Sequence, residues 1–214
     1  MSRTDALPAH QFEDVDQQRE AVSLGMWAFL VTEVMLFGGV FAGYAVCRNL
    51  FPEAFAEASN KLNVVLGAVN TAVLICSSLT MAVAVRSVQL NRQRQLALFL
   101  ILTLVLGTTF LGIKVVEYSH KFHEHLFPGG SFHAEGVHAP QMQIFFSFYF
   151  VMTGLHAIHM IVGISIMLFL LLQARRGRFS AEYNSPVEVA GLYWHFVDIV
   201  WIYLFPLLYL ISRA

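Results

Sequence analysis

The sequence has few charged residues. Asp, Glu, Lys and Arg make up 13% of its 214 positions, whereas a typical soluble domain has roughly 25%. Hydrophobic residues make up 57%, and the mean hydropathy is +0.62. This composition excludes an ordinary soluble domain and indicates an integral membrane protein. The formal net charge of −1 gives no electrostatic reason to expect nucleic acid as a partner.

Cysteine is also scarce. Cys47 and Cys76 lie in or next to apolar runs, without C-x-x-C spacing, which argues against a disulfide framework and a thiolate metal site. Residues 1–20 are polar and acidic and lack the apolar region and cleavage site of a signal peptide. We therefore expect residues 1–20 to form a short cytoplasmic arm and residues 21–214 to form a transmembrane domain.

Long apolar runs dominate the rest of the chain. A membrane-spanning helix needs about 20 predominantly apolar residues, and five stretches meet this requirement. None alternates polar and apolar residues as a barrel strand does, so each is predicted to be a helix. The predicted fold class is therefore all-α, a bundle of five transmembrane helices. The spans lie at about residues 21–47, 63–85, 96–117, 142–172 and 189–211.

The distribution of lysine and arginine predicts how the bundle is oriented. Eight of these residues fall on the side of the N-terminus and four on the other side. The positive-inside rule then places the N-terminus in the cytoplasm and the C-terminus outside. The eight are Arg3, Arg19, Arg86, Arg92, Arg94, Arg175, Arg176 and Arg178, and the four are Arg48, Lys61, Lys121 and Arg213.

Glu33 is the first candidate functional residue, because it lies near the middle of the first predicted span. A charge at the bilayer centre costs about 2.5–3.5 kcal/mol on insertion scales. We therefore expect a neutral acid that donates a hydrogen bond to another helix. At similar predicted depth, the fourth span offers His156 and His159 as acceptors. Two interpretations stay open: a structural strut and a proton-exchanging group.

The last span, YWHFVDIVWIYLFPLLY, places His195 and Asp198 three residues apart on one helical face. These side chains can bond each other or a neighbouring helix. His156 and His159 are also three apart and could in principle bind a haem. A bis-histidine haem needs imidazoles from facing helices, however, and only His195 is available as their partner. We therefore favour hydrogen bonding to Glu33 as the role of this pair.

The third span ends with Lys114 and Glu117, which are predicted to pair or to extend toward the headgroups. The connection after it, residues 118–141, is rich in histidine and could bind zinc or copper. It contains no thiolate, and Pro128 and two glycines interrupt it, so we interpret it as a solvated outer loop. Its histidines are His120, His123, His125, His133 and His138.

The YWHFVD run followed by Trp201 resembles the signature of subunit III of haem–copper cytochrome c oxidases. Further matches in the family's order lie on the other four spans, and together they cover nearly the whole chain. One departure is Lys114, where the family has glutamine. The matching segments are TEVMLF around Glu33, Asn70–Thr71 with Ser77–Ser78, Glu117–Tyr118, and TGLHAIHMIVG with His156 and His159.

The resemblance implies a proton-pumping terminal oxidase in the bacterial cytoplasmic (inner) membrane, which takes electrons from cytochrome c and reduces O2 to water. It implies that this chain has no catalytic residue and binds neither haem nor copper, which belong to the partner subunits, among them subunits I and II. It also implies a supporting role in stability and proton uptake, and bound phospholipid, for which Arg175 and Arg176 are candidate headgroup contacts. Longer family members have seven helices, and this chain resembles the last five.

Other functions remain as alternatives. Ubiquinol oxidases have the same five-helix form, nitric oxide reductase accessory proteins resemble it, and no motif here contacts an electron donor. A stand-alone transporter or proton channel could use the ionisable residues in the spans as a relay, although no inverted repeat is visible. A haem-binding membrane enzyme would need facing imidazoles.

Overall fold

The computed structural model describes residues 14–129, 132, 137–181 and 183–210. These residues form helices and no strand, and five helices are long and apolar enough to cross a membrane, which confirms the predicted fold class. The elements are α1 (Val15–Leu50), the short α2 (Pro52–Asn60), α3 (Val64–Gln89), α4 (Gln93–His123), α5 (Ala139–Arg175), α6 (Ser185–Phe205) and a π-helical turn, η1 (Pro206–Leu210).

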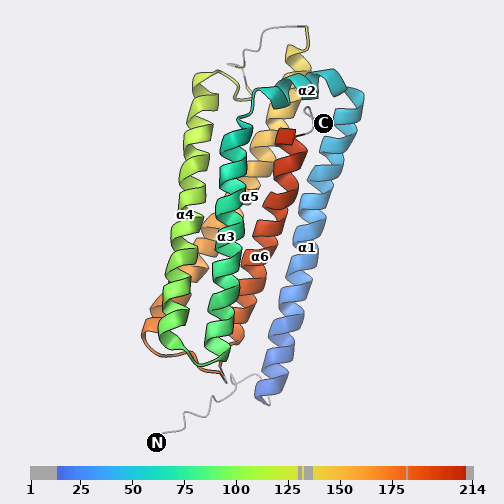
Figure 1. Cartoon of the computed structure of the whole chain (residues 1–214). Coiled ribbons are helices and arrows are strands. Elements are labelled where there is room, and N and C mark those ends of the chain that lie inside the picture. Colours follow the sequence, from blue (N-terminus) through green and yellow to red (C-terminus); the bar gives the residue numbers. More distant parts are fainter. Residues whose placement is uncertain (1–13, 130–131, 133–136, 182, 211–214) are drawn as a thin grey trace, which may run out of the picture.

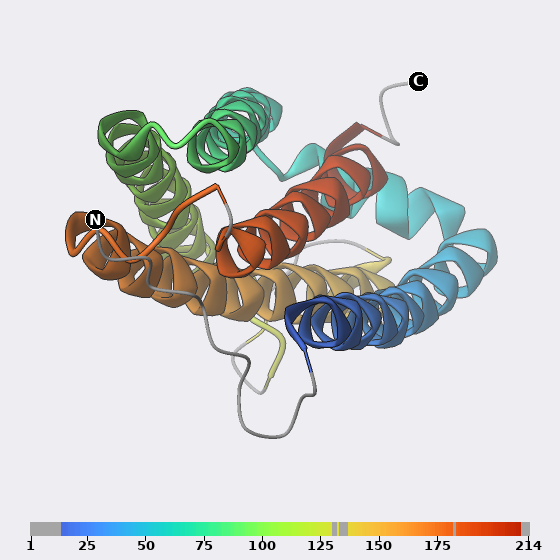
Figure 2. The same ribbon diagram turned by 90° about the horizontal axis from the view of Figure 1, so that it is seen from below.

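Consecutive long helices run antiparallel, and α2 lies across one end of the bundle (Figure 1). We call this the α2 end; the α3–α4 and α5–α6 connections lie at the opposite end. Viewed along the bundle, α3 and α4 lie side by side, and α1 lies away from them against α5 and α6 (Figure 2). Only 11% of the apolar window of α1 is buried, against 50% for the last span. Helix α1 is therefore an edge helix of this chain.

Several helices extend beyond the predicted spans. α1 begins at Val15, inside the predicted arm, because the Asp14 side chain caps it by accepting the Gln17 N–H at 2.6 Å. α4 continues to His123, so the prediction of a loop from residue 118 is wrong for this part of the chain. Polar residues continue these helices because extending an existing helix is easier than starting one. Helix α2 was not predicted, and His133 lies outside the described residues.

Trp194 joins the four helices α3 to α6 in the core. A Cβ atom added at Gly107 of α4 would lie 2.7 Å from the Trp194 ring, and one added at Gly163 of α5 would lie 2.9 Å from it. The indole N–H donates to Ser77 Oγ of α3 at 3.0 Å. Small residues at these positions let the indole insert where the helices approach closely. The tryptophan of the YWHFVD run is therefore a central packing residue.

Candidate functional site

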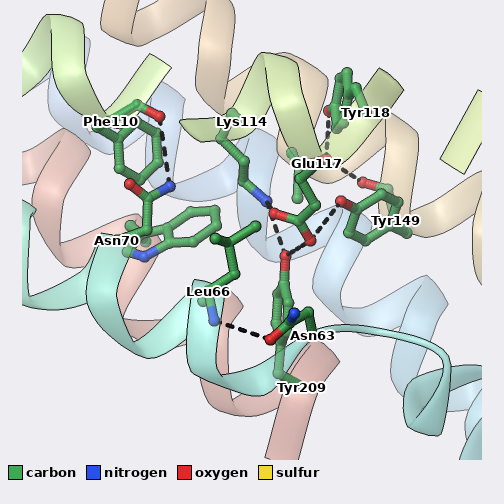
Figure 3. Close-up of polar contacts among 12 residues, drawn as sticks. Asn63, Leu66, Asn70, Phe110, Lys114, Glu117, Tyr118, Tyr149 and Tyr209 are labelled. Carbon is green, nitrogen blue, oxygen red and sulfur yellow. Dashed lines mark hydrogen bonds and ion pairs between the residues drawn. The ribbon is translucent and has the colours of Figure 1, made fainter. Parts of the chain in front are cut away.

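The first polar group lies near the α2 end, where Lys114 and Glu117 of α4 point into the bundle (Figure 3). Lys114 Nζ lies 2.9 Å from Glu117 Oε2, and both residues are buried. The ammonium also donates to the Tyr209 hydroxyl at 2.8 Å. The two residues therefore form the predicted ion pair, and they do so inside the bundle rather than by reaching the headgroups.

Aromatic side chains surround this ion pair. The hydroxyl groups of Tyr149 and Tyr209 donate to Glu117 Oε1 at 3.0 and 2.5 Å. Lys114 Nζ lies 4.6 Å from the centre of the Trp201 ring and 5.4 Å from each tyrosine ring, within cation–π range. Three donors thus converge on one carboxylate and complete its hydrogen bonds.

Tyr209 reaches the ion pair from η1. Pro206 has no N–H to continue the α-helical hydrogen bonds, and the chain continues from it as a π-helical turn. Two carbonyl oxygens of η1 accept side-chain hydrogen bonds, from the Tyr44 hydroxyl at 2.9 Å and from Ser59 Oγ at 2.8 Å. The end of the last span is therefore attached to α1, α2 and α4. The sequence analysis did not predict the roles of these tyrosines.

The second polar group joins α1 and α5 near the middle of both helices. Glu33 Oε2 lies 3.0 Å from His159 Nε2, and His159 Nδ1 lies 2.9 Å from the Leu155 carbonyl oxygen. A carbonyl only accepts, so Nδ1 carries a hydrogen, and the Glu33 and His159 atoms share a single proton between them. The two side chains are 14% and 13% exposed, which opens the pair to the outside of this chain. Of the two predicted acceptors, the structure selects His159.

His156 points into the core rather than toward α1. Its ring centre lies 5.4 Å from that of Phe110 and 5.2 Å from that of Trp201, and the residue is 1% exposed. Neither ring nitrogen has a hydrogen-bond partner in the described part of the chain. The two histidines of the fourth span therefore have different surroundings.

His195 and Asp198 share a face of α6 without a direct hydrogen bond between them. His195 Nδ1 lies 2.7 Å from Ser78 Oγ of α3, so His195 contacts a neighbouring helix. Asp198 is 2% exposed. Within the described ranges, neither of its oxygens has a hydrogen bond of normal geometry, although the Ser78 hydroxyl is close enough to interact with it.

The remaining predicted positions lie at the two ends of the bundle. Arg175 ends α5 and Arg176 follows it, both exposed at the end away from α2. His138 Nε2 lies 3.5 Å from Glu53 Oε2, and both side chains are solvent-exposed. Over the described ranges, no three His, Cys, Asp or Glu side chains converge as a metal site requires.

Comparison with known proteins identifies the family to which this chain belongs. The family described as "Cytochrome c oxidase subunit III" matches residues 9–213. The chain belongs to this family. It is therefore a subunit III of the haem–copper oxidases, as the motifs predicted, and a multi-pass membrane protein.

Relatives within the subunit III family carry two kinds of name. The chain is 31% identical to the cytochrome c oxidase subunit 3 of Thermostichus vulcanus over 191 residues, covering 89% of this chain and 87% of the relative. It is also 31% identical to the quinol oxidase subunit 3 of Bacillus spizizenii over 194 residues, covering 88% and 86%. The probable quinol oxidase subunit 3 of Staphylococcus aureus is 30% identical over 210 residues, covering 96% and 98%.

Proposed function

We propose that the chain is the non-redox subunit III of a proton-pumping terminal oxidase that takes electrons from cytochrome c in a bacterial cytoplasmic membrane. In this role it packs beside subunits I and II, which hold the haem and copper, and supports the stability and proton uptake of the catalytic subunit. The family match across all five spans carries the proposal. We also expect phospholipid at this chain, because the exposed Arg175 and Arg176 suit phosphate oxygens.

The surroundings of the imidazoles support a role without a redox centre. His159 bonds to Glu33, His195 bonds to Ser78, and His156 packs against aromatic rings. A haem held in a helical bundle needs two ligands turned toward each other from facing helices. In the described part of the chain, these histidines have three separate environments instead, an arrangement that does not suit a bis-histidine haem.

The pair of Glu33 and His159 is the group to which we assign a proton-related role. Its single shared proton can move between Oε2 and Nε2 without any rearrangement of the two helices. The pair also lies at the edge of the bundle, where a partner subunit or lipid can reach it. In contrast, the pair of Lys114 and Glu117 is enclosed, and we assign it to stability.

A quinol-oxidising complex is the second candidate, since two of the relatives above carry that name at the same level of identity. The test is to purify the tagged chain in mild detergent, record the optical spectrum and copper content of its partners, and assay O2 uptake with reduced cytochrome c and with a quinol. Turnover with cytochrome c supports the proposal. Turnover with quinol alone selects the second candidate, and partners without haem and copper overturn both.

The supporting role is tested by deleting the chain from the complex. The remaining subunits should still reduce O2, but they should lose activity sooner during turnover and take up protons more slowly. Loss of haem or copper from the catalytic subunit, with assembly otherwise intact, would contradict a purely supporting role.

A further inference from the structure

Three buried side chains in the middle of the bundle have polar atoms without a hydrogen-bond partner among the described residues. These atoms are Oδ1 of Asn70, both ring nitrogens of His156 and both carboxyl oxygens of Asp198. The three residues are 0%, 1% and 2% exposed. Unpaired buried polar atoms are unfavourable, and proteins satisfy nearly all of them with protein groups or with ordered water.

Shared neighbours place Asn70 and His156 in one layer of the core. Asn70 Nδ2 donates to the Phe110 carbonyl at 3.5 Å (Figure 3), and the His156 ring centre lies 5.4 Å from the Phe110 ring. The Trp201 ring completes the layer, with its centre 4.8 Å from that of Phe110 and 5.2 Å from that of His156. The layer therefore includes side chains from α3, α4, α5 and α6.

Asp198 extends this layer by one turn. It lies three residues before Trp201 on α6, on the same buried face, which corresponds to about 4.5 Å of helix rise. The nearby Ser78 hydroxyl lies 2.7 Å from His195 Nδ1 and also interacts with the Asp198 carboxyl group, without a hydrogen bond of normal geometry. The carboxyl group of Asp198 is thus buried next to the layer that holds His156, and the single Ser78 hydroxyl satisfies at most part of its hydrogen-bonding capacity.

The chemistry of these groups selects the ligand. A neutral imidazole offers one donor and one acceptor, a carboxyl group offers acceptors and, when protonated, one donor, and Asn70 Oδ1 only accepts. An anion does not suit a site beside a carboxyl group, and among the residues described no three ligating side chains converge on a metal. Water both donates and accepts, so it complements all three groups.

We propose that the core between α3 and α6 binds water molecules, with His156 and Asp198 as their main ligands and Asn70 Oδ1 as a third. This inference does not depend on the electron donor or on a role in proton uptake. The first test is an experimental structure of the native complex at a resolution that shows ordered water. Density within hydrogen-bonding distance of His156 and Asp198 is expected. Direct bonds from these groups to protein, or no such density when other buried waters are seen, would overturn the proposal.

The second test uses radiolytic hydroxyl labelling, which modifies buried side chains that touch bound water. Trp201 and Trp194 are both 0% exposed, but the Trp201 ring packs against His156, with ring centres 5.2 Å apart, whereas the Trp194 ring lies against two glycines and donates to Ser77. Trp201 should therefore be oxidised several-fold faster than Trp194 in the wild-type complex. The ratio should fall toward one in His156→Phe. Equal rates in the wild type would contradict the proposal, even if the variant fails to assemble.

A matched control is Ser165→Ala. The Ser165 hydroxyl bonds to a carbonyl of its own helix on the exposed side of α5, so this change should leave the labelling ratio unchanged. A ratio that fell equally in Ser165→Ala and His156→Phe would assign the effect to general loosening of the bundle and would count against bound water.

Discussion

Two acid–base pairs lie inside this bundle, and they are built differently. Lys114 and Glu117, 2.9 Å apart, are both on α4, with side chains only 6% and 3% exposed. Hydroxyl groups from α5 and η1 complete their hydrogen bonds. Glu33 and His159, 3.0 Å apart, join α1 to α5, with side chains 14% and 13% exposed. In the described part of the chain, the one further hydrogen bond of these two side chains joins His159 to the Leu155 carbonyl and stays within α5.

The difference indicates how each pair can contribute to the stability of the bundle. Taking two charges out of water is costly, and that cost is offset only when good geometry and additional hydrogen bonds surround them. The pair on α4 meets this condition, so it can hold full charges at a fixed position. The pair between α1 and α5 needs no net charge, because a neutral acid can donate to a neutral imidazole. We therefore expect the first pair to be sensitive to loss of charge and the second to tolerate it.

The largest effect is expected for Glu117→Gln. This change leaves the Lys114 ammonium buried without a counter-charge, and breaking a buried ion pair in this way costs about 3–5 kcal/mol. The free energy of unfolding in detergent, measured by thermal or denaturant titration, should fall accordingly. The double variant Lys114→Met with Glu117→Leu removes both charges and should regain most of the loss. Unchanged stability in Glu117→Gln would remove the distinction between the two pairs.

Next in size is Tyr209→Phe, which tests whether the hydroxyl groups stabilise the charges. The variant loses the donor to Glu117 and the acceptor for Lys114, and hydrogen bonds to charged groups contribute about 1.5–3 kcal/mol. Tyr203→Phe is the matched control, since Tyr203 is 65% exposed. Equal stability of the two variants would mean that the ion pair does not need η1.

Gly107→Ala provides an uncharged reference for the same bundle. Its new Cβ would meet the Trp194 ring at 2.7 Å, and overpacking of a core costs about 1–3 kcal/mol. The control is Gly112→Ala on the same helix, where nothing lies within 4 Å of the added Cβ; alanine there should be neutral or slightly stabilising. If Gly107→Ala costs more than Glu117→Gln, packing rather than charge determines the stability of this region.

The sequence predicted the spans and the members of both pairs, but it could not predict which other side chains surround each pair. Hydropathy marks a span directly, and the three-residue spacing of Lys114 and Glu117 predicts their contact. Tyr149 and Tyr209, however, come from 32 and 92 residues away along the chain. Continuous apolar runs do not show which helical face points inward, because every face is apolar.

The same limit explains why the sequence alone could not decide whether His156 or His159 contacts Glu33. Residues three apart differ by about 60° around a helix, so a modest rotation of α5 decides which of the two faces α1. Packing of large side chains such as Trp194 and Trp201 against α5 sets that rotation. No local pattern in the sequence predicts this rotation. The acceptor for Glu33 was therefore narrowed to two histidines and was resolved only by the structure.

The smallest effects are expected at Glu33. Glu33→Gln keeps an N–H donor for His159 Nε2 and should change the free energy of unfolding by less than about 1 kcal/mol, whereas Glu33→Ala leaves that nitrogen unpaired and should cost about 1–3 kcal/mol. Because Glu33 lies on the edge helix of a chain to which we assign no redox centre, the initial turnover of the purified oxidase should stay near the wild-type rate in both variants. Faster loss of activity during sustained turnover is expected in Glu33→Ala. A Glu33→Gln complex that is stable but inactive from the first turnover would instead identify Glu33 as an obligatory proton carrier, and the tolerance inferred for this pair would then be wrong.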